Sequence, residues 1–302
     1  MENVLVIGGN RYFGRRLVTR LRDSGARVSV LNRGSVPPPP GVERLVADRE
    51  DAAALGAVLA GREFDVVVDQ VCYTPLHAEG AVRTFAGRVG RYVMTSTIEV
   101  YDTGEDRPAG VPLGEDVVDP ARWPVRLELP WTDRQFRDRS YGEGKRQAEA
   151  VLARGDAFPF VAVRAGHVLG ADDFTGRLAH YRERIEAGLP VAVHPANLPS
   201  SYAHEAEMAD VLHWAAGARF TGAVNACSHG ELTATDLCDL IAQGSSYRTA
   251  APAPGDEASP FSFDRYYGMD NSRAEQLGYS FSHTRDWLPE LVAETLRRGA
   301  AA

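Results

Sequence analysis

The sequence has few cysteines, and no cysteine or histidine spacing that suits a metal ion. Its three cysteines, Cys72, Cys227 and Cys238, are odd in number and widely separated. They form neither a disulfide framework nor a zinc-ligand pattern. We therefore expect three reduced, largely buried thiols and no bound metal.

Long apolar runs and an excess of basic residues are also missing. No apolar run approaches the roughly 18 residues of a transmembrane helix, and the first run begins at Val4, which leaves no space for a signal peptide. The formal net charge of −8 argues against nucleic-acid binding, because affinity for a phosphate backbone depends on a basic surface. These absences predict a cytoplasmic protein that binds neither a membrane nor nucleic acid.

The N-terminus contains the pattern of a strand, a glycine turn and a helix. Residues 4–7 are uninterrupted apolar residues, as in a strand buried on both faces. Gly8 and Gly14 follow in a Gly-x-x-Gly-x-x-Gly pattern whose middle position is Arg11, and helical apolar spacing begins at Phe13. Such a turn places a free helix N-terminus where a pyrophosphate binds, although a turn without a ligand is the alternative.

Further apolar runs alternate with helical stretches, which predicts a parallel α/β sheet. Strands are expected at residues 28–31, 42–48, 64–69, 91–97 and 160–164. The predicted fold is a Rossmann-type, doubly wound sheet in residues 1–165. A smaller mixed α/β substrate lobe is expected in residues 166–302, with some segments returning to the first domain. Residues 102–140 are predicted to be an irregular excursion of the kind that serves as a lid or binding loop.

The ends of these strands supply candidate cofactor residues. An acidic residue after the second strand would bind the ribose of NAD, but Arg33 stands there instead. Together with Arg11 it favours NADP(H) over NAD(H), unless Arg33 is only a surface charge. Asp48, at the end of the third strand, can accept from an adenine amino group. The candidates for binding the dinucleotide are Gly8, Asn10, Arg11, Tyr12, Phe13, Gly14, Asn32, Arg33, Asp48, Arg49, Gln70, Tyr141, Lys145 and His167.

Several short motifs occur in an order that resembles the extended short-chain dehydrogenase/reductase superfamily, in its NAD-dependent epimerase/dehydratase branch. The resemblance covers almost the whole chain. Besides the glycine turn, the motifs are residues 95–101, Tyr141-x-x-x-Lys145, residues 163–170, residues 202–210 and residues 272–279.

The resemblance implies an NAD(P)-dependent enzyme with a Thr-Tyr-Lys triad. Tyr141 would exchange the proton of the reacting oxygen, and Thr97 would polarise that oxygen. Lys145, on the same helix face as Tyr141, would hold the nicotinamide ribose and lower the pKa of Tyr141. Glu99 matches the base of family dehydratases, but Ile98 replaces their acid, so simple dehydration is disfavoured. Glu99 is then either a second catalytic base or a surface residue.

Three functions are compatible with these residues. The leading one is hydride transfer at a ketone or secondary alcohol of a small-molecule substrate. The second is a sugar-nucleotide epimerase or dehydratase with tightly bound NAD; against it, His167 replaces the Asn common in such members, and no Arg lies near Ser200 to bind a diphosphate. The third is a non-catalytic dinucleotide- or RNA-binding protein, because the arginine in the glycine turn, Arg11, resembles the turn of an atypical branch whose members bind RNA. Members of that branch can lack the catalytic Tyr and Lys, both of which are present here, and this argues against the third function.

A homodimer is one assembly that the resemblance allows.

Overall fold

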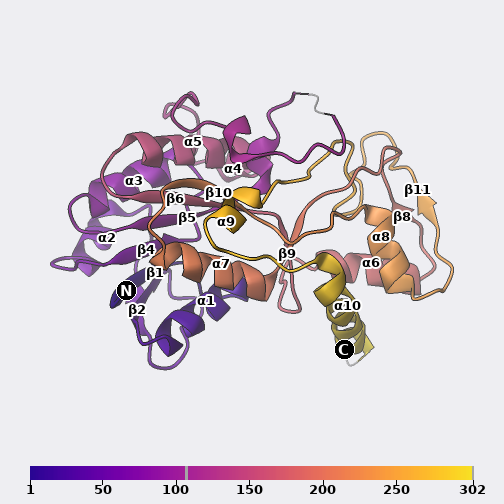
Figure 1. Ribbon diagram of the computed structural model, residues 1–302, viewed down its shortest axis with the longest axis horizontal. Coiled ribbons are helices and arrows are strands. Elements are labelled where there is room, and N and C mark those ends of the chain that lie inside the picture. Colours follow the sequence, from indigo (N-terminus) through magenta and orange to yellow (C-terminus); the bar gives the residue numbers. More distant parts are fainter. Residues whose placement is uncertain (106–107, 301–302) are drawn as a thin grey trace.

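The computed structural model describes residues 1–105 and 108–300, and a parallel sheet forms the centre of this part (Figure 1). Its seven strands lie in the order β10-β6-β5-β4-β1-β2-β3. The architecture confirms the predicted fold class. The strands are β1 (Asn3–Ile7), β2 (Arg27–Asn32), β3 (Glu43–Val46), β4 (Val66–Asp69), β5 (Tyr92–Thr97), β6 (Phe160–Ala165) and β10 (Gly222–Ala226).

The strand order reverses between β1 and β4. From β1 the chain continues to β2 and β3 on one side of the sheet, and β4 then returns to pair with β1 on the other, with Ile7 opposite Asp69. In an open parallel sheet, the ligand crevice lies beyond the carboxyl ends of the strands at such a reversal. The fold therefore directs attention to the residues that follow β1 and β4.

Helices cover both faces of the sheet, which explains why residues 4–7 of β1 are all apolar. Val4 and Val6 pack into one core together with α1 (Tyr12–Asp23) and α7 (Glu205–Gly217). Leu5 and Ile7 point the opposite way into a second core, against α2 (Ala52–Val58), α3 (Pro75–Phe85) and α5 (Tyr141–Arg154). Successive strand residues face opposite sides, so a strand covered on both sides has no position that faces solvent.

A third core lies beyond the sheet, at the right in Figure 1. It joins α6 (Arg177–Glu186), α8 (Ala234–Ala242) and α10 (Thr284–Ala300). Two short parallel pairs complete it: β8 (Val191–Ala192) with β11 (Thr249–Ala250), and β7 (His167–Leu169) with β9 (Tyr202–His204).

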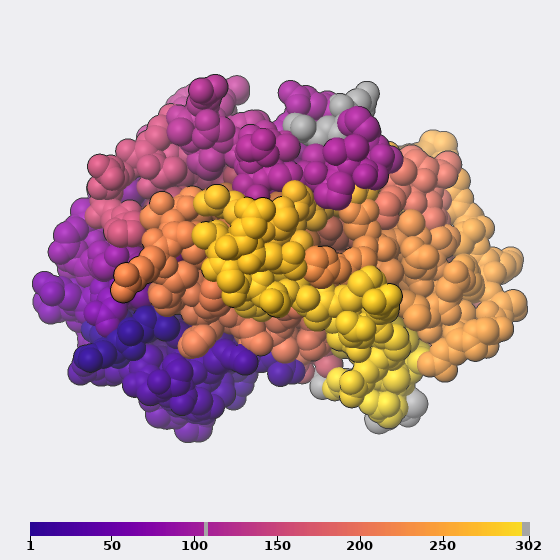
Figure 2. Space-filling view, viewed as in Figure 1, coloured from indigo at the N-terminus to yellow at the C-terminus, as the bar shows by residue number. Residues whose placement is uncertain are grey.

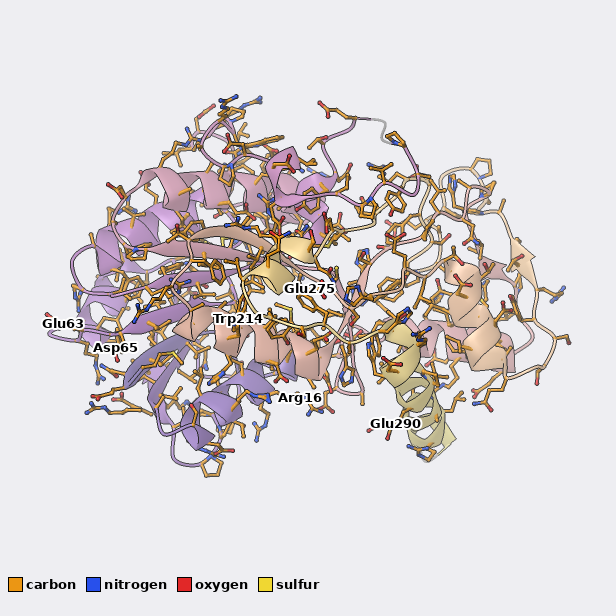
Figure 3. The ribbon with its side chains drawn as sticks, in the orientation of Figure 1. Arg16, Glu63, Asp65, Trp214, Glu275 and Glu290 are labelled. Carbon is orange, nitrogen blue, oxygen red and sulfur yellow. The ribbon has the colours of Figure 1, made fainter. Side chains whose placement is uncertain are left out.

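Segments of the second half of the chain contribute to the sheet and to the helices that cover it. Besides α7, strand β10 pairs with β6, and α9 (Ser272–Gln276) contacts β10. On α7, Trp214 packs against Tyr279, with ring centroids 5.3 Å apart, and Arg16 of α1 forms an ion pair with Glu205. Trp214 and Arg16 are labelled in Figure 3. In Figure 2 the yellow C-terminal residues accordingly lie across the middle of the molecule beside the orange ones. The division at residue 165 stays a prediction.

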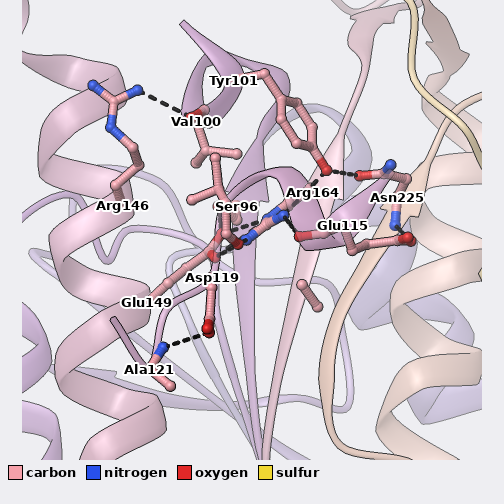
Figure 4. A network of polar contacts seen from close by, with 12 residues as sticks. Ser96, Val100, Tyr101, Glu115, Asp119, Ala121, Arg146, Glu149, Arg164 and Asn225 are labelled. Atoms are coloured by element: carbon pink, nitrogen blue, oxygen red, sulfur yellow. Dashed lines mark hydrogen bonds and ion pairs between the residues drawn. The ribbon is translucent and has the colours of Figure 1, made fainter. Parts of the chain in front are cut away.

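The excursion between β5 and α5 is irregular but anchored. It contains the short helices η1 (Ile98–Tyr101), η2 (Glu115–Val117) and α4 (Arg134–Arg139). The buried Arg164 of β6 donates to the carbonyls of Glu115 (2.9 Å) and Val118 (2.8 Å), which fastens the excursion to the sheet (Figure 4).

Within the described part of the chain, no helix is both long and apolar enough to cross a membrane. Cys72, Cys227 and Cys238 are buried and form no disulfide.

Candidate functional site

A cleft of about 980 Å³ opens at the carboxyl ends of the central strands, where the reversal of strand order predicts a ligand. Its walls come from segments far apart in the sequence. They are the turn after β1, the loop after β4, the end of β5, the start of α5, and the β7–α6 connection with Asp173, Phe174 and Arg177. The cleft thus lies between the sheet and the C-terminal core.

The turn after β1 depends on its glycines. Gly8 and Gly9 adopt positive φ angles of 92° and 79°, a region that side chains rarely allow. A Cβ on Gly14 would lie 2.7 Å from the Cα of Gly9 and 2.3 Å from Oε1 of Gln70. Arg11 precedes α1 without capping it through its side chain, which leaves the first N–H groups of the helix for a ligand. This is the arrangement that binds a pyrophosphate.

Buried polar atoms without partners gather around the cleft. Unsatisfied polar groups cost free energy, and in a native protein such a group calls for a partner. Six cleft residues carry one, counted over the described residues: Oδ1 of Asn10, Oη of Tyr12, Nδ2 of Asn32, Nε2 of Gln70, Oγ1 of Thr95 and Nε2 of His167. A ligand with many hydrogen-bonding groups along its length, such as a dinucleotide, fits this set.

The structure brings most of the predicted cofactor residues to the cleft. Those that line it are Gly8, Asn10, Arg11, Tyr12, Phe13, Asn32, Gln70, Tyr141, Lys145 and His167. Gly14, Arg33, Asp48 and Arg49 do not line it.

Two of the four predicted cofactor residues that do not line the cleft, Arg33 and Arg49, lie where another role is evident. Arg33 is exposed, so of the two arginines that favour NADP(H) only Arg11 reaches the cleft. Arg49 pairs with the fully buried Asp69 at 2.8 Å, and the hydroxyl of Tyr92 donates to the same carboxylate. Arg49 therefore stabilises a buried carboxylate, which local sequence could not reveal because these residues belong to three separate elements.

The proposed catalytic residues share the cleft as well. Thr97 ends β5, Glu99 lies in η1, and Tyr141 and Lys145 occupy the first turns of α5. Glycines allow this close packing: a Cβ on Gly142 would lie 2.4 Å from the carbonyl oxygen of Glu99.

The pKa of Tyr141 differs from the sequence-based expectation. Although its side chain keeps 36% of its surface exposed, the packed walls of the cleft raise its pKa well above 10, with Tyr73 and Glu99 adding to the increase. The neighbouring Thr97 hydroxyl acts in the opposite direction. The pKa of Tyr141 is thus raised by burial, and not lowered as the sequence led us to expect.

Lys145 is almost completely buried, at 1% exposure. Its Nζ donates to the carbonyl oxygen of Thr95 at 2.7 Å and lies 5.8 Å from the ring centroid of Tyr141. Burial lowers the pKa of Lys145 to about 8, because desolvation disfavours the charged amine.

Glu99 and His167 face the same cleft with different properties. Burial and Asp102 raise the pKa of Glu99, whose carboxylate accepts a hydrogen bond from the hydroxyl of Tyr267 at 3.4 Å. His167 stacks on Phe263, with centroids 5.0 Å apart, and burial lowers its pKa to about 3. The imidazole is therefore neutral at physiological pH.

Two arginines beside these residues are engaged by the protein itself. Arg146 pairs with Glu143 at 2.8 Å and donates to backbone carbonyls of η1 and the residue after it. Arg177 pairs with Asp173 at 3.3 Å and donates to the carbonyl of Val168 at 2.8 Å. Tyr73, Asp173 and Arg177 are cleft residues that the sequence did not single out, since no local motif marks them.

Residues 4–86 match the model of the NAD dependent epimerase/dehydratase family. Comparison with curated protein sequences gives no match.

Solved structures share the fold over nearly the whole chain. UDP-glucose 4-epimerase from Thermotoga maritima with UDP-glucose has a TM-score of 0.77 at 16% identity and covers 99% of each chain. UDP-glucose 4-epimerase from Thermus thermophilus with NAD has a TM-score of 0.72 at 20% identity, over 97% of this chain and 98% of that one. The Bordetella bronchiseptica enzyme WbmH with NAD⁺ has a TM-score of 0.72 at 19% identity, over 98% of each chain.

At these identities the solved structures show a common fold. Together with the match over residues 4–86, they confirm the resemblance predicted from the sequence. Residues 4–86 therefore carry the sequence pattern of this family, and the whole chain shares the fold of the solved epimerases.

Proposed function

We propose that the protein transfers hydride between a nicotinamide dinucleotide and a ketone or secondary alcohol. The observation that carries this proposal is the presence of Thr97, Tyr141 and Lys145 in the same cleft as the glycine turn after β1. The buried, unpartnered polar atoms around that cleft support a long polar ligand there.

The dinucleotide, when bound, supplies or accepts the hydride. The hydroxyl of Thr97 would donate a hydrogen bond to the reacting oxygen, and Tyr141 would exchange that oxygen's proton. Because its pKa is raised, Tyr141 is a protonated phenol at physiological pH, which suits it to donate a proton as a ketone is reduced. Lys145 would keep a positive charge beside the phenolate formed by this donation.

Sugar-nucleotide epimerisation is the second candidate, because two of the structural neighbours are UDP-glucose 4-epimerases. A diphosphate substrate needs cations near the catalytic residues, but Arg146 and Arg177 are already paired with carboxylates. His167 is neutral there and Glu99 adds a carboxylate. Apart from Arg139, which also lines the cleft, this balance of charges favours a substrate without phosphate.

The choice of dinucleotide belongs to the same proposal. Arg11 at the cleft favours NADP(H), whereas the exposed Arg33 contributes nothing to it. Two of the three neighbours described above were solved with NAD, which gives the NADP(H) preference no support.

Replacement of Tyr141 tests the function. We expect Tyr141→Phe to lower turnover of NADH or NADPH with a panel of uncharged ketones by about 100-fold or more. Affinity for the dinucleotide, measured by fluorescence titration, should stay within about threefold, which is less than about 1 kcal/mol. Undiminished turnover in the variant would refute the assignment. Retained NAD in the purified protein, together with conversion of UDP-glucose to UDP-galactose, would favour the second candidate instead.

A further inference from the structure

The aromatic ring of Tyr73 lies against the amine of Lys145. Its centroid is 4.8 Å from Nζ, closer than the 5.8 Å that separates Nζ from the ring of Tyr141. The two tyrosine rings are 6.2 Å apart. The amine thus contacts two aromatic rings, and the nearer one comes from the loop after β4, outside the motifs noted in the sequence.

Several contacts fix Tyr73 at this place. Its backbone N–H donates to Nδ1 of His77 at 3.2 Å. On the other side, a Cβ on Gly144 would lie 2.4 Å from the carbonyl oxygen of Tyr73, so only glycine lets α5 pack this close. Gly144 immediately precedes Lys145, and the same close packing therefore brings the amine to the ring.

The buried amine has few other sources of compensation. Taking an ammonium group out of water costs free energy unless nearby groups replace the lost hydration. The carbonyl of Thr95 accepts one hydrogen bond from Nζ, and an ammonium has three donors. An aromatic face attracts a cation through its quadrupole, and this attraction is strongest where water is excluded.

We propose that Tyr73 is a positioning residue whose ring holds the ammonium group of Lys145, in its charged form, beside Tyr141. Its role in turnover rests on the proposed function, in which Lys145 has to be charged. The hydroxyl of Tyr73 is not needed for this role, and the ring is. The groups around Lys145 that also influence its charge are Asp69, Cys72, Glu149 and Tyr141, which favour or contact the ammonium, and Arg49, which disfavours it.

The composition of the chain permits a direct test. The sequence contains a single lysine, Lys145, because every other residue in its total of lysine and arginine is an arginine. Protein labelled with ¹⁵N at lysine Nζ therefore gives one side-chain resonance, whose dependence on pH reports the pKa of Lys145 without any substrate.

In the parent protein we expect a pKa of about 8 for Lys145. Tyr73→Leu should lower this pKa by about one unit, because the ring attraction is lost, whereas Tyr73→Phe should leave it within about 0.3 units. In turnover assays, the loss of activity at alkaline pH should move to lower pH by the same amount in Tyr73→Leu only. A pentafluorinated phenylalanine at position 73 keeps the size of the ring and reverses its quadrupole, so it should behave like leucine even if leucine impairs folding.

An unchanged pKa of Lys145 in both Tyr73→Leu and the pentafluorinated variant would overturn the proposal. A decrease of the same size in Tyr73→Phe would overturn it as well. A merely structural role would lower turnover evenly at all pH values and leave the resonance unaffected. Failure of the proposed function is a separate result: it would appear as full turnover in Tyr141→Phe, and the titration of Lys145 does not depend on it.

Discussion

The ion pair between Glu149 and Arg164 offers a quantitative test of how α5 is held against the sheet. Both side chains are completely buried, and Nη2 of Arg164 lies 2.7 Å from Oε2 of Glu149. The same carboxylate accepts from the hydroxyl of Ser96 at 2.5 Å (Figure 4). The pair therefore joins α5 to β5 and β6, one helical turn beyond Lys145.

Glu149→Gln keeps the shape of the side chain and removes its charge. Breaking one partner of a buried pair costs about 3–5 kcal/mol, since the other charge is left without compensation. Arg164 would keep its hydrogen bonds to the hydroxyl of Tyr101 (3.1 Å) and to two backbone carbonyls, so we expect a loss of about 3 kcal/mol, the lower end of that range. That is a large part of the roughly 5–15 kcal/mol by which folded proteins are stable.

Urea unfolding followed by circular dichroism measures the effect. A matched control is Glu79→Gln, which breaks an exposed pair with Arg83 and should cost less than about 0.5 kcal/mol. The double variant Glu149→Leu/Arg164→Met should recover much of the loss, because it leaves no buried charge alone. A Glu149→Gln protein whose stability lies within about 1 kcal/mol of the control would refute the reasoning.

Two further predictions concern acid stability and the cofactor. Because the pKa of His167 is about 3 when folded and about 6.5 when unfolded, its contribution to stability is complete above pH 6.5. Below that pH it should fall by about 1.4 kcal/mol per pH unit, and His167→Gln should remove this part of the loss between about pH 7 and pH 5; equal losses in both proteins would contradict it. Fluorescence titration should show that Arg11→Ala weakens NADPH binding about tenfold while Arg33→Ala leaves it unchanged, and the reverse order would place the 2′-phosphate at Arg33.

The sequence predicted the sheet because its signals are local. Residues 4–7 are apolar throughout, and the structure explains this by burial on both faces of β1. The glycine turn, Thr97, Tyr141 and Lys145 came from short motifs, and all of them meet at one cleft, as a parallel sheet with a reversal after β1 requires.

What the sequence could not predict depends on contacts between distant segments. Arg49 follows a predicted strand, yet its charge is used by Asp69, and Tyr73 carries no motif although it contacts Lys145. The short parallel pair β7–β9 was likewise missed, because strands of three residues leave no periodicity to detect. The pKa of Tyr141 was expected to be lowered, whereas burial raises it. The sequence could not show this, because burial is a property of the folded chain.

Lysine and arginine differ chemically when they are buried, and this difference explains where each is used in the protein. A guanidinium group stays charged even when buried, and at Arg164 the protein surrounds it with a carboxylate, a hydroxyl and backbone carbonyls. An amine is smaller, and its pKa responds readily to burial, as that of Lys145 does. A chain that otherwise relies on arginine has its single lysine beside Tyr141, where the proposed reaction requires a cation. The groups around this lysine, with Tyr73 among them, are therefore where we expect the chemistry of the site to be decided.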